Sequence, residues 1–523
     1  MSPLCDGRHT AGNLLGGNVP GVMAERTPVL VGVGQVRGNR SRDVAAAREP
    51  AELVAAAVSA AATDTGVPAL LAAADTIATV RTTTWAYADL GGRIAAQVGA
   101  RNAHTTDSTV GGQWPAVLLE RAAARIADGS SQVAIVAGGE AMASLGALRA
   151  AGIDPAGAGW SAEPGGPPAF DPDELGSPAM VAAGIVLPRR VYPLFHSAHR
   201  HAAGLPPDAA SARSAALYAA FTEVAAANPA AWNPQVRTAA EIAEPGAGNR
   251  MVCEPYPLAQ NAMPHVDQAA AVVVTSLAAA RAHGVPADRI VHIAGGAGAV
   301  DSPDVLARPS FATSAAVADA LDRTLAGLNP RTLDVIDVYS CFPIVPELVA
   351  AHLGLPVAAV VGVTGGHNAF GGPLSSYTLH ALVAVTQRLR AAGGRALVHG
   401  NGGYLTHQHA LLLSREPAPY RGDPQPRDTA GPAPRLVPVP DVAEATVEAA
   451  TVEYGRDGTP EQGFLVARLP DGARIAATTP PGDPDAARAL SLHRHGAPRE
   501  IVGVRVRVTR KDGHVAVDTL EDQ

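Results

Sequence analysis

The segment Gly365-Gly-His-Asn-Ala-Phe-Gly-Gly-Pro373 is followed by a helical stretch and by Ala396-Leu-Val-His-Gly-Asn-Gly-Gly403, and the same order occurs earlier in the chain. The earlier copy begins with the loop Val110-Gly-Gly-Gln113, continues as a helix, and reaches the apolar strand Gln132-Val-Ala-Ile-Val136 before Gly138-Gly139. A glycine-rich loop therefore leads into a helix twice, and twice a strand ends in glycines. This repeat predicts a duplicated α/β unit. Glycine in such loops lets a ligand approach the backbone and favours anion binding at the helix start, although ordinary loop geometry favours the same residues.

Strands and helices alternate along residues 27–415. The run Thr27-Pro-Val-Leu-Val-Gly-Val-Gly34 is continuously apolar, which is typical of a buried strand. An alanine-rich helix is expected over Glu49–Thr63 and a strand over Thr76–Val80. This alternation predicts a sheet covered by helices. Three further elements are expected: an irregular insertion at 154–188, a helix at 211–227, and a strand beginning at Asp267.

The chain changes character after residue 415. Many prolines and no periodicity between Glu416 and Pro440 predict a linker. Beyond it, short stretches of alternating apolar and polar residues predict strands joined by turns such as Pro470-Asp-Gly472. The strands are expected at 445–454, 463–469, 473–479, 501–509 and 514–517. Residues 441–523 are therefore expected to form a small antiparallel β-barrel of the OB-like kind.

Composition narrows the class of protein. The net charge of −8 and the lack of any Lys/Arg block argue against nucleic acid as the main partner. Three widely separated cysteines (Cys5, Cys253 and Cys341) fit neither a disulfide framework nor a zinc motif, and they suit a reducing cytoplasm. No apolar run is long enough to predict membrane insertion. Residues 1–26 lack a signal-peptide pattern and are expected to be a disordered extension, with either Met1 or Met23 as the start.

Four short blocks fall at the predicted loops and strand ends. They are Ala137-Gly-Gly-Glu140 with the loop before it, Asp337-Val-Tyr-Ser-Cys-Phe-Pro343, Gly371-Gly-Pro373, and Val398-His-Gly-Asn-Gly-Gly403. In their order along residues 27–415 they resemble the four active-site blocks of the thiolase superfamily. The resemblance implies a thiolase fold of two duplicated βαβαβ halves, layered α/β/α/β/α, with the site where the halves meet. The halves would span 27–285, including the loop insertion, and 286–415.

The blocks lack the catalytic residues of that family. Its nucleophilic cysteine would fall between Val110 and Gly112, where there is none, and a thiolate is the nucleophile of thiolase chemistry. Tyr339 stands in place of a histidine, Gly372 in place of another, and the cysteine of the fourth block is also missing. The motifs that remain are similar to a group called thiolase-like protein type 1, whose members add a C-terminal β-barrel. They are Tyr339-Ser-Cys-Phe-Pro343, Gly-Gly-Pro followed by Tyr377 and His380, and Gly400-Asn-Gly-Gly-Tyr-Leu-Thr406.

Five side chains are candidates for catalysis. Tyr339 follows a predicted strand, where α/β sites gather, and it could be an acid, a base or an oxyanion donor, or simply a packing residue. Tyr377 and His380 share one helix face. Cys341 is either a displaced nucleophile or an inert buried thiol, and His409 lies near the fourth loop. The residues expected to shape a substrate pocket are Gly111, Gly112, Gln113, Gly371, Gly372, Asn401, Gly402 and Gly403.

Three functions remain open at this stage. The first is a protein that handles an acyl-CoA thioester, an acyltransferase of the acetyl-CoA acetyltransferase kind by similarity, yet without thiolase activity. The second is a carbon–carbon lyase acting on a β-hydroxyacyl-CoA through Tyr339 and Tyr377. The third is a non-catalytic protein that binds acyl-CoA or a protein partner. The expected ligand is a coenzyme A thioester, with no permanent cofactor and no metal, since His407 and His409 have no third ligand. A monomer or a homodimer is expected.

Overall fold

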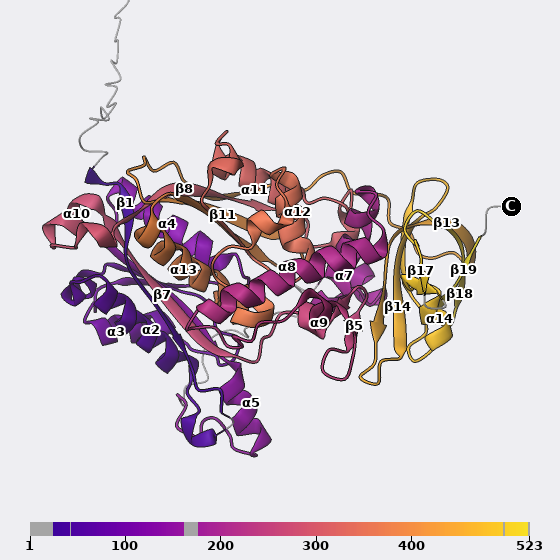
Figure 1. Cartoon of the computed structure of the whole chain (residues 1–523), viewed down its shortest axis with the longest axis horizontal. Coiled ribbons are helices and arrows are strands. Elements are labelled where there is room, and N and C mark those ends of the chain that lie inside the picture. The colour runs from indigo at the N-terminus through magenta and orange to yellow at the C-terminus, as the bar shows by residue number, and fades with distance from the viewer. Residues whose placement is uncertain (1–24, 42, 162–175, 495–496, 521–523) are drawn as a thin grey trace, which may run out of the picture.

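The computed structural model describes residues 25–41, 43–161, 176–494 and 497–520. It has two parts: an α/β body around a ten-stranded sheet, and a smaller antiparallel sheet at one end of the molecule (Figure 1). The extension predicted over residues 1–26 lies almost entirely outside the described residues. Among the helices of the described residues, none combines the length and the apolar character needed to cross a bilayer.

The large sheet consists of two halves with the same strand order. From the edge to the middle the order is β3-β2-β4-β7-β1 in the first half and β9-β10-β11-β8 in the second. The halves join where Val29 and Leu30 of β1 pair with His292 and Val291 of β8. This symmetry confirms the predicted duplication. The strands are β1 (Pro28–Arg37), β2 (Thr76–Thr79), β3 (His104–Asp107), β4 (Val133–Ala141), β7 (Asp267–Ser276), β8 (Val291–Val300), β9 (Val335–Val338), β10 (Arg395–Gly402) and β11 (His407–Ser414).

The second half has one strand fewer than the first. The segment that corresponds to β3 forms only a short 3-10 helix, Val357–Val360. The carboxylate of Asp337, in β9, accepts hydrogen bonds from the amides of Val363 and Thr364 at 2.8 and 3.1 Å. These bonds hold the segment at the end of β9 instead of alongside it, so that β9 remains the edge strand.

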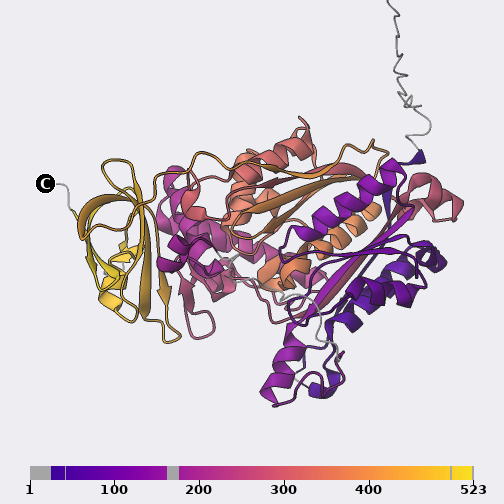
Figure 2. The ribbon, with the colours of Figure 1, turned by 180° about the vertical axis from the view of Figure 1, so that it is seen from behind.

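Helices form three layers around the two half-sheets. The repeat helices α4 (Trp114–Asp128) and α13 (Tyr377–Ala392) pack together between the halves (Figures 1 and 2). Their apolar residues share one hydrophobic cluster with strands of both halves, and α13 is buried around its first turns as expected for a central helix. The outer layers contain α2 (Pro50–Asp64) and α3 (Leu90–Val98) on the first half, and α11 (Ala315–Leu325) and α12 (Ile344–His352) on the second. The predicted α/β/α/β/α order is thus observed.

The inserted segments form an additional helical region between the body and the C-terminal domain. It contains α6 (Pro178–Ala182), α7 (Pro188–Ala202), α8 (Pro207–Ala227) and α9 (Ala239–Ala243), and Figure 1 shows α7 next to the C-terminal strands. The insertion predicted at 154–188 falls partly outside the described residues, which omit 162–175. Its described end contains α6.

The prediction of an unstructured linker over 416–440 was wrong in part. Residues Asp423–Asp428 form β12, which pairs in parallel with β8 at its outer side. Pro424 and Pro426 lack an N–H group, which an edge strand tolerates and a central strand does not. The proline-rich composition therefore predicted a linker here, because the pairing of this strand depends on a partner that is distant in the sequence.

The C-terminal domain is a curled antiparallel sheet with the order β15-β14-β13-β18-β19. The edge strands β15 and β19 contact each other, which gives the domain a barrel-like shape. The strand predicted at 501–509 begins only at Arg505, because Gly503 has a φ of +80° that interrupts the extended backbone. The strands are β13 (Val442–Tyr454), β14 (Pro460–Arg468), β15 (Arg474–Thr478), β18 (Arg505–Lys511) and β19 (His514–Thr519); from the body, β5 (Met251–Cys253) pairs with β13.

Two buried arginines attach this domain to the body. Arg474 is completely buried, binds the carboxylate of Glu448, and donates to the carbonyl oxygens of Leu306 and Arg308 at 2.6 Å each. From α7, the equally buried Arg200 makes a two-pronged contact of 2.7 and 2.9 Å with the Glu500 carboxylate. Charges removed from water must be paired, so these contacts define one docked position for the domain.

Candidate functional site

Four loops from both halves meet next to the N-termini of the central helices. The amide of Gly111 donates to Ser375 Oγ at 3.0 Å, and Thr378 Oγ1 donates to the Gly112 carbonyl at 2.7 Å. The start of α4 is thereby bonded to the start of α13. The loops are 110–113 before α4, 339–343 after β9, 365–376 before α13, and 402–406 between β10 and β11.

Gly112 lies directly against the ring of Tyr339. A Cβ atom on Gly112 would be 2.3–2.4 Å from the Tyr339 atoms Cε2, Cζ and Oη, closer than real side chains approach. The Tyr339 hydroxyl donates to the Leu374 carbonyl at 3.4 Å. The ring of Tyr339 therefore fills the space beside the loop where a side chain from residue 112 would project.

Other predicted pocket glycines are packed against two glutamine side chains. A Cβ atom on Gly402 or on Gly111 would be 1.8 or 2.3 Å from Oε1 of Gln113, and one on Gly371 would be 2.4 Å from Oε1 of Gln268. A side chain at any of these three positions would have to displace the end of a glutamine side chain. Gly372 differs, because its nearest neighbours would be 3.4 Å away.

An aromatic cluster lies behind these glycines. The imidazole of His367 stacks on the ring of Tyr377 with 3.5 Å between centroids and lies 4.3 Å from the ring of Tyr339. His367 belongs to a single turn of π-helix, Gly366–Phe370, a feature often found at functional sites. Burial raises the pKa of both tyrosines well above the usual value and lowers the pKa of His367 well below it. All three side chains are thus uncharged near neutral pH.

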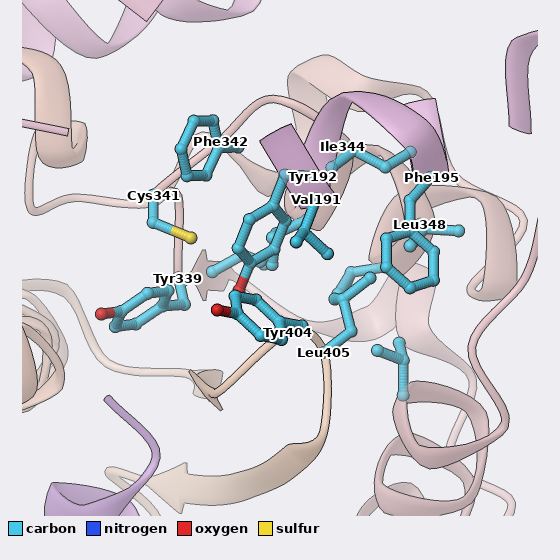
Figure 3. Close-up of a cluster of buried hydrophobic side chains, with 14 of the residues drawn as sticks. Val191, Tyr192, Phe195, Tyr339, Cys341, Phe342, Ile344, Leu348, Tyr404 and Leu405 are labelled. Carbon is cyan, nitrogen blue, oxygen red and sulfur yellow. The ribbon is translucent and has the colours of Figure 1, made fainter. Parts of the chain in front are cut away.

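Cys341 is held as a neutral thiol. Burial raises its pKa to about 12. Its sulfur is 3.9 Å from Asn401 Nδ2 and contacts the hydroxyl of Tyr192, a residue of α7. Figure 3 shows Cys341 among the rings of Tyr192, Tyr339 and Phe342, with the Tyr339 hydroxyl directed away from Tyr192. This environment favours the inert thiol over a displaced nucleophile.

Asn401 belongs to a continuous chain of hydrogen bonds. Its Nδ2 donates to the Tyr192 hydroxyl at 2.9 Å, and its Oδ1 accepts from Gln408 Nε2 at 2.8 Å. Gln408 Oε1 in turn is 2.8 Å from His399 Nε2, and the Tyr192 hydroxyl donates to the Gly403 carbonyl at 2.6 Å. Both ends of the Asn401 amide are satisfied by protein atoms, so its evident task is to fix the fourth loop.

His380 and His409 lie apart from the Tyr339 cluster. His380 contacts Gln35 of β1 through Nδ1 at 2.9 Å and packs on Phe370. His409, in β11, is buried against Gly298 of β8. Within the described part of the chain, neither forms a hydrogen bond or ring contact with Tyr339. No cluster of three or more His, Cys, Asp or Glu side chains that could hold a metal was found among the described residues.

Three residues at the junction were not recognised from the sequence as functional candidates. The sequence places His367 in the third loop, but only its short separation from Gly372 could have indicated it as a candidate site residue. Ser340, buried between Tyr339 and Cys341, binds the imidazole of His367. Tyr192 comes from the helical insertion, and no local signal connects it with the four loops.

A separate cavity lies at the border of the C-terminal domain. It has a volume of about 340 Å³, and Arg189, Arg250, Glu453 and Arg456 are among its lining residues. Glu453 already pairs with Arg189 and Arg190. None of the residues at the four-loop junction lines this cavity.

Comparisons with known proteins agree with both parts of the structure. The family model described as "thiolase-like protein type 1 additional C-terminal domain" matches residues 425–514. A crystal structure of a monomeric SCP2-thiolase-like protein type 1 from Mycobacterium smegmatis aligns with a TM-score of 0.77 and 28% identity, over 95% of this chain and 100% of that one. Residues 425–514 thus match the additional domain of the type 1 thiolase-like proteins, and the whole chain is similar to a protein of that type.

Two further solved structures align with about three quarters of this chain. Human mitochondrial 3-ketoacyl-CoA thiolase aligns with a TM-score of 0.54 and 16% identity, over 75% of this chain and 99% of the human one. A structure described as the Ltp2–ChsH2(DUF35) aldolase gives 0.54 and 19%, over 75% of this chain and 98% of that one. No curated protein sequence matches the chain. At such low identity these two structures support the thiolase fold alone.

Proposed function

We propose that this thiolase-like protein binds an acyl-CoA thioester at the four-loop junction and does not form an acyl-enzyme. The observation that carries the proposal is the ring of Tyr339 against Gly112, which fills the space that a nucleophile on the first loop would need. Covalent catalysis requires an activated nucleophile within reach of the carbonyl carbon. The loop offers only glycine and valine there.

Cys341 is a poor replacement for that nucleophile. Its pKa of about 12 leaves almost no thiolate near neutral pH, and its contacts with Tyr192 and Asn401 are those of a packed thiol. The thiolate is the reactive form of cysteine. A thioester bound here would therefore keep its acyl group on coenzyme A.

The two helix N-termini at the junction can stabilise a partly negative oxygen atom. The helices α4 and α13 both begin there, and the partial positive charge of a helix N-terminus favours the partly negative oxygen of a thioester. Tyr339 and Cys341 retain 8% and 9% exposure, so solvent reaches this side of the cluster.

The lyase alternative has less support from the geometry. Cleaving a β-hydroxyacyl-CoA requires a base that removes the hydroxyl proton. Tyr339 and Tyr377 stay protonated because burial raises their pKa values well above the usual range. They can donate hydrogen bonds, yet as bases they are weak candidates.

Native mass spectrometry combined with a turnover assay tests the proposal. After incubation with acetyl-CoA or acetoacetyl-CoA, we expect a mass increase equal to the intact thioester, lost completely on denaturation, and no CoA-dependent cleavage of acetoacetyl-CoA. An acyl adduct that survives denaturation, or measurable thiolysis, would contradict it. Cleavage of a β-hydroxyacyl-CoA into two fragments would favour the lyase.

A further inference from the structure

His367 lies beside the position where the third loop has glycine. In that loop, Gly372 takes the position that a histidine holds in the corresponding active-site block of the thiolase superfamily. A Cβ atom on Gly372 would be 3.4 Å from His367 Cδ2, the ring atom bonded to Nε2. The imidazole of His367 thus reaches the place next to Gly372 from five residues earlier in the chain.

Ser340 determines which ring nitrogen of His367 carries the proton. The backbone amide of Ser340 donates to Nδ1 at 3.3 Å, and its Oγ is 3.1 Å from the same atom while accepting the His367 amide at 3.2 Å. A backbone amide can only donate, so Nδ1 must be the nitrogen with the free lone pair. Burial keeps the ring neutral. The remaining ring proton is therefore on Nε2.

Nε2 of His367 is a buried donor without an acceptor. The residue is 1% exposed, and Nε2 has no hydrogen-bond partner among the described residues. An unmatched buried N–H group costs about 1–3 kcal/mol, and native proteins retain few of them. Its stacking on Tyr377 and its bonds to Ser340 prevent the ring from turning toward another partner.

We propose that the Nε2–H group of His367 donates a hydrogen bond to the thioester carbonyl oxygen of the bound acyl-CoA, beside Gly372. This inference rests on the proposed function and deepens it, because it names the atom that recognises the acyl group. The hydrogen bond polarises the carbonyl without breaking any covalent bond. Since Nε2 already bears the proton, His367 acts as a donor and not as a base.

Infrared difference spectroscopy with carbonyl-¹³C-labelled acetyl-CoA measures this hydrogen bond directly. With the wild-type protein, the bound carbonyl band should move to lower wavenumber than the free band. The variant His367→Phe keeps a ring that can stack on Tyr377 but has no donor. It should bind acetyl-CoA no more than about tenfold more weakly, with the band near its free position.

His292→Gln is the matched control. His292 is also a buried histidine with a lowered pKa and an unmatched Nδ1. His292, in β8, pairs with Ser414, whereas the fourth loop lies at the opposite end of β11, so the two are at opposite ends of the strands. This variant should show the wild-type band. An equal shift in the His367→Phe protein would overturn the inference while leaving thioester binding intact.

A second measurement does not depend on a variant that folds. In ¹⁵N-histidine-labelled wild-type protein, NMR should show the ring of His367, assigned by through-bond correlation, as the neutral Nε2–H tautomer at neutral pH. An Nδ1–H tautomer or an imidazolium would overturn the inference. Failure of the wild-type protein to bind any acyl-CoA would instead refute the proposed function, and with it the acceptor named here.

Discussion

The Oη, Cζ and Cε2 atoms of Tyr339 lie 2.3–2.4 Å from the point where Gly112 would carry a Cβ atom. One loop of each half therefore meets in a contact that only glycine on one side and an aromatic ring on the other can make. Any side chain introduced at residue 112 would therefore have to displace that ring.

Gly112→Cys should destabilise the protein without creating thiolase activity. The new side chain would collide with Tyr339, and overpacking of this kind typically costs about 1–3 kcal/mol in the free energy of unfolding. Adding Tyr339→Ala removes the obstacle, so the double variant should be less destabilised than the sum of the single variants. Urea unfolding measures all three.

Gly372→Ala is the control for this cycle, because its Cβ atom would have 3.4 Å of clearance. It should change the free energy of unfolding by less than about 1 kcal/mol and show no coupling to Tyr339→Ala. Strict additivity for Gly112→Cys and Tyr339→Ala would show that the ring does not occupy the space beside Gly112.

Cys341 should react very slowly with iodoacetamide. Its pKa of about 12, against an ordinary value of 9.0, lowers the thiolate fraction about a thousandfold near neutral pH. Alkylation of a variant with Cys5→Ser and Cys253→Ser, followed by mass spectrometry, should be slower by at least that factor in buffer than in urea. Comparable rates in the two conditions would revive Cys341 as a candidate nucleophile.

Glu120 should make stability depend on pH. It is buried in α4, accepts a hydrogen bond from the Tyr420 hydroxyl at 2.5 Å, and has a pKa raised to about 7, mainly by burial. The folded state therefore holds this proton more tightly than the unfolded state. The resulting penalty is absent below about pH 4.5 and grows as the pH rises to about 7.

Glu120→Gln removes that charge and should stabilise the protein relative to wild type by up to about 3 kcal/mol at pH 8, with little gain at pH 4. Thermal or urea unfolding at several pH values measures the difference. Glu244→Gln, at an exposed position, is the comparison and should change the free energy of unfolding by less than about 0.5 kcal/mol. A pH-independent effect of Glu120→Gln would contradict the assignment.

Arg474→Met should loosen the C-terminal domain. The variant leaves two buried carbonyl oxygens without their donor and Glu448 with Arg468 as its remaining partner, and breaking a buried pair costs up to about 3–5 kcal/mol. Limited proteolysis between residues 416 and 440 should become faster. The exposed pair of Arg505 and Glu444 is the comparison, and Arg505→Met should cost less than about 1 kcal/mol. Similar losses from both variants would show that Arg474 does not anchor the domain.

Local patterns were sufficient to predict the duplicated architecture. The glycine-rich loops before α4 and α13 and the apolar strands after them recur in the same order, and both depend only on neighbouring residues. The strand Asp423–Asp428 escaped prediction because its prolines hide a pairing with β8, and the strand expected from Ile501 was shortened by the backbone at Gly503. The local periodicity of the sequence does not specify pairing partners or backbone angles of this kind.

By itself, the sequence determined that the first loop consists of valine, two glycines and glutamine, that residue 372 is a glycine, and that two similar units follow one another along the chain. Only the tertiary structure decided that Tyr339 covers Gly112, that Tyr192 from the helical insertion holds the fourth loop, and that His367 lies beside Gly372. The physical reason is that these relationships join residues from different loops and layers. Their distances follow from how the two halves and the inserted helices pack, and no spacing along the chain encodes that packing.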